Sequence, residues 1–327
     1  MTDKSRIVAA DSGAIAQATA ILRGGGIVAV PTETVYGLAA RAADADAVAR
    51  IYAAKGRPSF NPLIVHVSGT VQAAELVVVD ALAAQLMAAF WPGALTLVLP
   101  LRPGAEVASL VTTGLDTLAV RCPAHPVMQA LIASAGPLAA PSANASGQIS
   151  STSAAHVAAS LAGWDGLILD GGACAAGVES TIVRVADGGW QVLRPGAVAV
   201  EAIMAVAGPA KDPSPGSLRE SDLSLAGRGI VAPGMMDSHY APRQPVRLEA
   251  STSAPGEFHI GFGTVAGDIN LSASSDVAEA AARLFDLLHQ AQASGRAAIA
   301  VAPVPMSGLG AAINDRLRRA AAPRGSE

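Results

Sequence analysis

Apolar positions recur along this chain with two different periods, and the periods predict helices alternating with short strands. Helical spacing predicts helices over residues 14–23, 44–55, 127–134, 153–162, 276–292 and 309–320. Short apolar runs bounded by turn residues predict strands over 27–30, 63–67, 95–99, 117–121, 137–140, 167–169, 181–185, 190–194, 246–248, 258–262 and 297–301. This alternation is typical of an α/β fold, in which helices pack on a buried sheet.

The amino-acid composition of the chain changes twice along its length, and these changes divide it into three parts. Residues 1–207 carry most of the predicted strands and are expected to form one mixed α/β domain. Residues 208–244 are rich in proline, serine and glycine and are expected to be a linker. The run 235–242 within this linker is too rich in bulky side chains for an idle spacer. Residues 245–327 predict a second, small α/β domain.

The composition indicates a folded protein and argues against a strongly basic, a disulfide-rich or a zinc-binding one. Apolar residues make up 51% and charged residues 15%, which indicates a folded chain. The net charge of -4 gives no overall positive field, so RNA would have to be bound by a local basic cleft. Cys122 and Cys174 are the only cysteines, and their spacing indicates neither a disulfide framework nor a zinc site.

No membrane segment is expected, and the predicted location is the cytoplasm. Residues 1–6 are polar and lack the apolar core of a signal peptide. The uncharged stretch 81–101 is long enough to span a membrane, but Trp91-Pro92-Gly93 interrupts it. A buried helix, a turn and a buried strand are the predicted structure.

Two cations lie close together at the junction between a predicted helix and a predicted strand. Lys55 falls in the last turn of a helix that Asp44 caps and Gly56 ends, and Arg57 follows at once. Two nearby prolines stiffen the loop, so the pair could clamp phosphate or carboxylate oxygens. The alternative is a solvated helix end whose cations complement the helix dipole. His66, in the following strand, is either a ligand-binding group or a buried core histidine.

Further hydroxyls and cations stand at strand ends and in tight loops, where α/β domains usually build their sites. They lie in residues 31–37, at Arg121, and in residues 141–147, 179–181 and 194–196. The chain has no nucleophile-elbow pattern and no flanked pair of carboxylates. The predicted chemistry is therefore the positioning of a polyanion rather than covalent catalysis. Each hydroxyl could instead bond only the local backbone.

These motifs carry a resemblance to a known family. Residues 32–38, 55–58, 61–66, 90–93, 119–123, 141–144 and 179–183 resemble the YrdC-type fold and, more narrowly, the threonylcarbamoyl-AMP synthases. Residues 238–242, followed by a small domain, resemble the longer, two-domain branch of that family. The resemblance implies a twisted mixed sheet with helices and a basic concave cleft, plus a small Rossmann-like C-terminal α/β domain.

The resemblance also implies an activity. The family are nucleotidyltransferases that make threonylcarbamoyl-AMP and pyrophosphate from L-threonine, bicarbonate or carbon dioxide, and ATP. The product then serves a tRNA threonylcarbamoyl transferase complex, which modifies adenosine next to the anticodon. No carboxylate pair is set aside for a metal, so Mg²⁺ is expected to arrive on the triphosphate.

The motif positions imply roles for individual residues. The catalytic group is Lys55, Arg57, Ser142 and Asn144. The ATP contacts are Arg57, Asn61, Thr117, Ser142, Arg194 and Tyr240, with Tyr240 closing over the nucleotide from a lid-like linker. The threonine contacts are Thr32 or Thr34, His66, Arg121, Ala140 and Ser180.

Two other functions fit parts of the pattern. One is an RNA-binding module, against which stand the acidic net charge and the few aromatic residues. The other is a carbamoyl transferase that uses carbamoyl phosphate and ATP. Such enzymes carry additional metal-binding domains, for which two cysteines leave no place.

Overall fold

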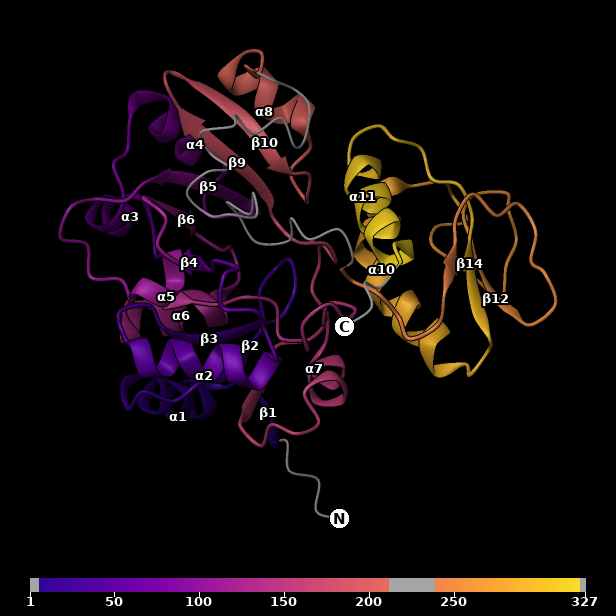
Figure 1. The fold of residues 1–327 in the computed structure, drawn as a ribbon, viewed down its shortest axis with the longest axis horizontal. Coiled ribbons are helices and arrows are strands. Elements are labelled where there is room, and N and C mark those ends of the chain that lie inside the picture. Colours follow the sequence, from indigo (N-terminus) through magenta and orange to yellow (C-terminus); the bar gives the residue numbers. More distant parts are fainter. Residues whose placement is uncertain (1–5, 212–238, 324–327) are drawn as a thin grey trace.

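Among residues 6–211 and 239–323, which this computed structural model describes, ten strands form one mixed sheet (Figure 1). In chain order the strands are β1 (Arg6–Ala9), β2 (Val28–Val30), β3 (Gly37–Arg41), β4 (Ile64–His66), β5 (Leu95–Pro100), β6 (Thr117–Arg121), β7 (Leu138–Ala139), β8 (Leu167–Asp170), β9 (Thr181–Ala186) and β10 (Gly189–Arg194). Across the sheet their order is β1-β8-β2-β3-β7-β4-β6-β5-β9-β10. Sequence neighbours are thus often separated in the sheet, which brings distant motifs together.

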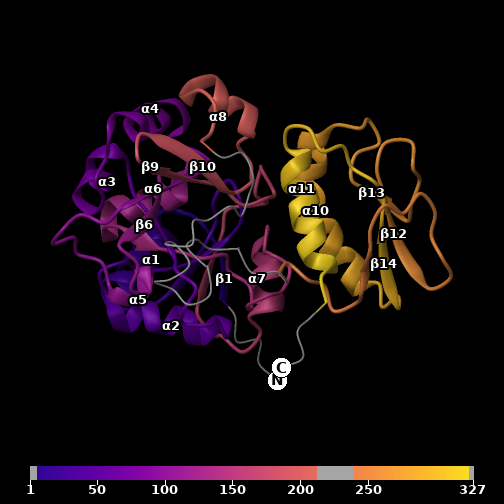
Figure 2. The same ribbon diagram turned by 45° about the horizontal axis from the view of Figure 1, so that its top comes forward.

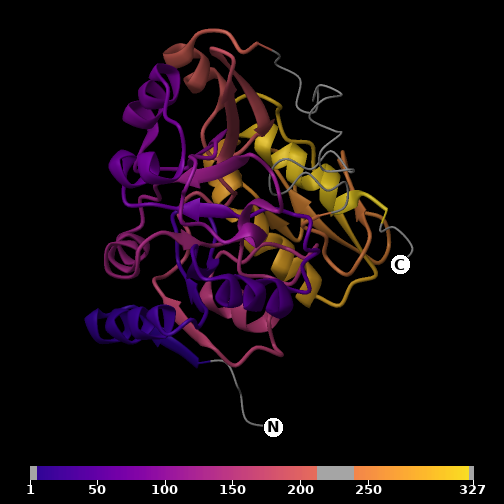
Figure 3. The same cartoon turned by 60° about the vertical axis from the view of Figure 1, so that its left-hand side comes forward.

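Helices cover most of this sheet. They are α1 (Ser12–Arg23), α2 (Ala45–Lys55), α3 (Thr70–Leu76), α4 (Ala81–Phe90), α5 (Ser109–Thr112), α6 (Pro126–Ala135), α7 (Ala154–Ser160) and α8 (Val200–Ala207). Around β2 and β8, helices α1 and α6 pack on one face and α2 and α7 on the other. Around β5, β6 and β9, helices α3, α4 and α8 pack on one face only. These layers can be followed in Figure 3.

The predicted elements of this domain are confirmed, and several others were missed. The stretch 81–101 forms α4, a turn and β5, and no helix of the described residues is long and apolar enough to cross a membrane. The missed elements are β1, β3, α3, α5 and α8. β3 reads Gly-Leu-Ala-Ala-Arg, without the β-branched residues that indicate a strand, and its pairing with β2 and β7 supplies what local propensity lacks.

A smaller sheet follows the linker. It contains β11 (Val246–Arg247), β12 (Glu257–Gly261), β13 (Ile269–Asn270) and β14 (Ala298–Val301), all parallel, in the order β11-β14-β12-β13. Helices α10 (Val277–Ala293) and α11 (Gly310–Ala321) lie between this sheet and the first domain (Figure 2). The strand β13 was missed, and the boundaries of the other elements differ by a residue from the sequence prediction.

The two sheet domains share a hydrophobic cluster. Val35, Ile149 and Val178 of the first domain are buried together with side chains of α10 and α11. The predicted division into residues 1–207, 208–244 and 245–327 stays a prediction, although α8 ends at Ala207 and β11 begins at Val246. Most of the predicted linker, with Ser238, lies outside the described residues.

Candidate active site

One face of the large sheet carries a buried apolar cluster without helix residues and forms the floor of a cleft. Side chains alternate between the two faces of a strand, and Leu97 of β5 and Val120 of β6 face the helices. The alternate positions form a small apolar cluster made only of strand residues: Ile64, Val98, Ala119, Ile182 and Leu193. Beside it lies a hollow of about 570 Å³, open solvent included.

Most of the predicted site residues line this hollow. They are Thr32, Thr34, Arg57, His66, Arg121, Ala140, Ser142, Ser180, Arg194 and Tyr240. The same alternation that sets the apolar floor on this face turns His66 and Arg121 toward the cleft, since these two residues are register partners on β4 and β6. Sheet order, rather than sequence distance, therefore assembles the site.

Arg194 reaches the cleft through a β-bulge. The pairing of β9 with β10 is regular up to Val192, after which the register shifts and Arg194 stands opposite Ile182. Ile182 belongs to the apolar floor, so the extra residue turns Arg194 to the cleft side. Its guanidinium donates to the carbonyl and hydroxyl oxygens of Ser180 at 2.9 and 3.3 Å.

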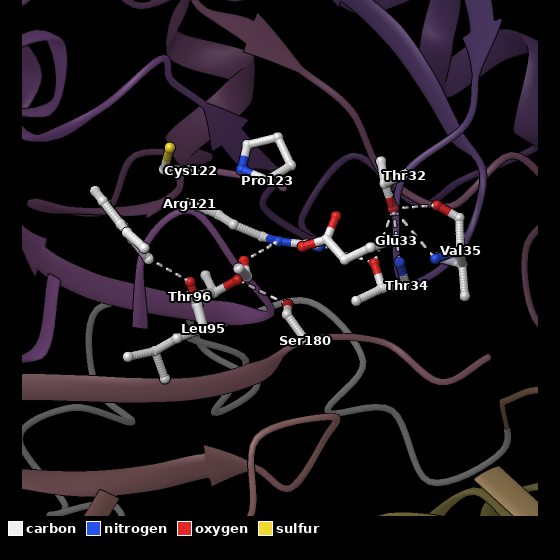
Figure 4. A network of polar contacts seen from close by, with 12 residues as sticks. Thr32, Glu33, Thr34, Val35, Leu95, Thr96, Arg121, Cys122, Pro123 and Ser180 are labelled. Carbon is white, nitrogen blue, oxygen red and sulfur yellow. Dashed lines mark hydrogen bonds and ion pairs between the residues drawn. The ribbon is translucent and has the colours of Figure 1, made fainter. Parts of the chain in front are cut away.

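Arg121 lies at the centre of a polar network (Figure 4). Its guanidinium forms an ion pair with Glu33 at 2.6 Å and donates to the hydroxyl of Thr34 at 2.8 Å. Burial alone would raise the pKa of Glu33, but the charge and hydrogen bond of Arg121 outweigh it and hold that pKa below its usual range. On the neighbouring strand, the hydroxyl of Thr96, the register partner of Arg121, lies 2.7 Å from that of Ser180.

Thr32 and Thr34 are both buried and have different partners. The Thr32 hydroxyl donates to the carbonyl of Val35 and accepts from the amides of residues 34 and 35, which closes a local turn. The Thr34 hydroxyl lies 2.9 Å from that of Thr32 and accepts from Arg121. Thr34 is thus linked to the cation of the cleft, whereas Thr32 stabilises the loop.

His66 is a neutral, buried ligand candidate. Burial, together with the nearby charge of Arg121, lowers its pKa to about 3. Its Nδ1 is buried and has no hydrogen-bond partner within the described part of the chain. Buried polar atoms are almost always paired, so this nitrogen is suited to a bound molecule.

The two cations of the sequence motif have different surroundings. Arg57 lines the hollow and is anchored by donating to the backbone carbonyls of Asn61 and Pro62 at 3.2 and 2.9 Å. Lys55 is buried behind the hollow and donates to the carbonyls of Ser142, at 2.5 Å, and Asn144. Burial and the charge of Arg57 set the pKa of Lys55 well below its usual range.

Asn144, Asn61 and Thr117 complete the sequence-predicted set but do not line the hollow. The Asn144 amide donates to the carbonyls of Ala145 and Gln148, which fixes the loop after Ser142. Asn61 anchors Arg57 through its carbonyl. Thr117 starts β6, four residues from Arg121 and on the same face of the strand.

The hollow also includes two lining residues to which the sequence assigned no role or only a motif position. Glu179 and His239 line it beside the expected Tyr240. The Tyr240 hydroxyl and His239 Nδ1 are buried and have no partner among the residues described. The sequence signal for both was the bulky run 235–242 in the linker. Arg316, which contacts Glu179 from α11, was missed altogether.

Comparisons with known proteins show the family of the chain. A family model described as telomere recombination matches residues 20–196, and one described as threonylcarbamoyl-AMP synthase, C-terminal domain, matches residues 198–322. A threonylcarbamoyl-AMP synthase of Pyrococcus abyssi is 40% identical over 322 residues, which are 93% of this chain and 92% of that protein. The chain belongs to the threonylcarbamoyl-AMP synthase family.

Two further members of the family extend the comparison. A threonylcarbamoyl-AMP synthase of Bacillus subtilis is 49% identical over 236 residues, which are 72% of this chain and 66% of that protein. The crystal structure of P. abyssi Sua5 complexed with L-threonine superposes with a TM-score of 0.85 at 36% identity, covering 97% of this chain and 96% of that one. Membership of the family makes the chain a nucleotidyltransferase of tRNA modification.

Proposed function

We propose that this cleft binds L-threonine and ATP side by side and converts them, with bicarbonate, into threonylcarbamoyl-AMP and pyrophosphate. The observation that carries the proposal is the meeting of two kinds of group in one hollow. Hydroxyls and a neutral imidazole, from Thr34, Ser180 and His66, suit a small amino acid. The guanidiniums of Arg57 and Arg194 suit a polyphosphate.

The threonine end of the cleft is proposed at Arg121. Thr34, His66, Ala140 and Ser180 complete this end, and Thr32 supports it through the turn that holds Thr34. Burial in this pocket strengthens each polar contact to the ligand. The relative from P. abyssi has been crystallised in complex with L-threonine, which supports the same ligand class here.

The nucleotide end is proposed over the apolar floor. Arg57, Ser142, Arg194 and Tyr240 line this side of the hollow, and Asn61 and Thr117 border it.

The threonine amine captures bicarbonate as a carbamate and releases water. A carbamate oxygen then attacks the α-phosphorus in line, and pyrophosphate leaves. The arginines spread the charge that develops on the phosphate, and hydroxyls orient it. Lys55 and Asn144 hold the Ser142 loop in place.

Mg²⁺ is proposed to enter with the triphosphate as part of the substrate. The two carboxylates nearest the proposed ligands are both in ion pairs, Glu33 with Arg121 and Glu179 with Arg316. A carboxylate neutralised by an arginine is a poor site for a resident cation. The ion then supplies charge neutralisation on the phosphates and keeps most of its waters.

The test is direct. Purified protein with ATP, bicarbonate and L-threonine should release pyrophosphate and give a product with the mass of threonylcarbamoyl-AMP, and omission of any one substrate should abolish both signals. Carbamoyl phosphate in place of bicarbonate and threonine should give no product. Salt-dependent RNA binding without ATP consumption would instead favour an RNA-binding module. Transfer of the product to tRNA is proposed to need a separate transferase complex, which can be added as a second step.

A further inference from the structure

Arg316 is an arginine of the C-terminal domain that is completely buried against the first domain. It lies on α11 with 0% of its surface exposed. Its Nε forms an ion pair with Glu179 at 2.8 Å, and its Nη1 donates to the carbonyl of Pro195, also at 2.8 Å. Its guanidinium carbon lies 5.2 Å from the centre of the Tyr240 ring, within range of a cation–π contact.

These contacts reach three walls of the ligand hollow. Glu179 and Tyr240 line the hollow themselves. Pro195 directly follows Arg194, the cation that the β-bulge turns into the cleft. One guanidinium from the second domain therefore contacts two lining residues of the hollow and the residue that follows a third.

The charge of Arg316 also favours the ionised form of the Glu179 carboxyl group. The Glu179 carboxylate accepts from the hydroxyl of Ser150 at 2.5 Å on its other side. Burial would raise the pKa of Glu179, but the charge of Arg316 and then that of Arg194 outweigh it and lower that pKa. An ionised carboxylate beside a polyphosphate is repulsive unless it is neutralised, and Arg316 is the larger of the two cationic contributions that act on Glu179.

Stability alone does not account for this arginine. Ile313, Arg316, Leu317 and Ala320 follow the spacing of one helix face, so the arginine occupies a position on the apolar side of α11. Replacing a buried ion pair by apolar residues is often neutral or stabilising. Its Nη2 is buried without a hydrogen-bond partner among the described residues, which adds a cost that a purely structural residue would avoid.

We propose that Arg316 is a positioning residue of the active site, supplied by the C-terminal domain. By holding Glu179, the turn after Arg194 and the Tyr240 ring together, it completes the nucleotide side of the cleft when the second domain is docked. The inference rests on the proposed binding of ATP in this cleft. It gives the C-terminal domain a part in catalysis that does not require any of its residues to touch the reacting atoms.

The test compares Arg316→Met with Arg247→Met. Arg247 is a matched control, because it belongs to the same domain and also forms an ion pair, with Glu257 at 2.6 Å, on the exposed surface. Arg316→Met should raise the KM for ATP about tenfold or more, the size of a typical coupling between sites, with a smaller fall in kcat at saturating ATP. Arg247→Met should leave both constants near those of the unmodified protein.

Two further variants separate positioning from folding. Glu179→Gln, added to Arg316→Met, removes the unpaired carboxylate and should bring the KM for ATP back toward its original value. Arg316→Lys keeps the charge but lacks the forked guanidinium that reaches both Glu179 and Pro195. Its KM for ATP should therefore lie between that of the unmodified protein and that of Arg316→Met. It also serves as the test if the methionine variant does not fold. A purely structural residue would instead lower the fraction of active protein, and with it kcat, at an unchanged KM.

Direct ATP binding by calorimetry distinguishes failure of this inference from failure of the proposed function. If the unmodified protein binds ATP but makes no product, the proposed reaction fails, and the inference is decided by the dissociation constants of the variants. An unchanged KM and dissociation constant in folded Arg316→Met, or an equal change in Arg247→Met, would overturn the inference. An unmodified protein that does not bind ATP would overturn both.

Discussion

At the scale of single residues, the neighbouring cations Lys55 and Arg57 have different structural roles. Arg57 lines the hollow, with its guanidinium fixed by two backbone carbonyls. The Lys55 side chain donates its hydrogen bonds to the backbone carbonyls of Ser142 and Asn144. The first is positioned to meet a phosphate, and the second shapes the loop that carries Ser142.

This difference predicts opposite effects for two alanine variants. Arg57→Ala should keep the melting temperature and lose activity, by about 2.7 to 4 kcal/mol of barrier if the guanidinium contacts the transferred phosphate as an oxyanion donor does. Lys55→Ala should lower the melting temperature, because two buried carbonyls lose their donor at about 1–3 kcal/mol each. Calorimetry and pyrophosphate release on both variants check this. Full turnover by Arg57→Ala would remove that residue from the site.

The pairing of Thr34 with Arg121 predicts the choice of amino acid. If these groups bind the threonine hydroxyl in a closed pocket, 2-aminobutyrate leaves them unpaired and should be rejected strongly. Serine keeps the hydroxyl and lacks one methyl, so its penalty should be about 1 to 3 kcal/mol, or roughly 10- to 200-fold. Valine should be as poor as 2-aminobutyrate. Pyrophosphate release is measured with each amino acid at fixed ATP and bicarbonate; equal rates with 2-aminobutyrate and serine would contradict the assignment.

Motif residues were the part of the site that the sequence could predict, because hydroxyls and cations at strand ends mark α/β sites wherever the strands meet. Arg194 was expected as well, but the bulge that turns it into the cleft has no local sequence signal. Arg316 left a weak signal, an arginine at an apolar position of a helix, which only the docked first domain explains. The sequence left Thr32 and Thr34 as alternatives, and their different hydrogen bonds are the ground on which we propose Thr34.

At the scale of elements, strand alternation explains why one sheet can hold both a core and a cleft. Val65 and Val120 face the helices, whereas their neighbours His66 and Arg121 face the hollow. The apolar runs that form these strands can be recognised in the sequence, so most strands and their buried faces were predictable. The order of the strands was not, because it depends on long-range pairing that no local pattern records.

The contact of α10 with the first domain is close enough to predict a steric effect. Gly177 has φ +68°, and a Cβ there would lie 2.3 Å from the carbonyl oxygen of Ala282 on α10. Gly177→Ala should therefore destabilise the protein by about 1–3 kcal/mol of overpacking, in addition to backbone strain. Gly104→Ala is the control, because Gly104 has φ +79° but nothing within 4 Å of a new Cβ. Equal losses of stability on urea unfolding would show that strain alone is responsible and that α10 can give way.

At the scale of the whole molecule, two of the polar contacts between the domains meet at the hydrogen-bonded pair Ser150 and Glu179. Arg316 holds Glu179, and the hydroxyl of Ser150 donates to the same carboxylate. The ring of His289, on α10, donates to the carbonyl of Ser150 at 3.1 Å and stacks on His156, with 4.0 Å between ring centres. Docking of the second domain thus acts on the same residues that back the ligand hollow.

The stacked pair predicts how the whole protein responds to acid. Burial, followed by the neighbouring His156, lowers the pKa of His289 to about 4, and His156 has a lowered pKa as well. An exposed histidine in the unfolded chain has a pKa of about 6.5, so between these values the unfolded state binds more protons. The free energy of unfolding should therefore fall as the pH drops from about 6.5 to about 4, by up to about 3 kcal/mol from His289. Asp286, 3.4 Å from His156, moderates the effect.

His289→Gln isolates this contribution, because glutamine can still donate to the Ser150 carbonyl but takes up no proton. Urea unfolding at pH 8 should give similar stabilities for the two proteins, since both imidazoles are neutral there. At pH 4.5 the glutamine variant should be the more stable, and its loss between the two pH values should be smaller. His66, whose pKa is lowered to about 3, titrates in both proteins and cancels from the comparison. Parallel stability curves across this range would mean that protonation of His289 does not strain the junction between the domains.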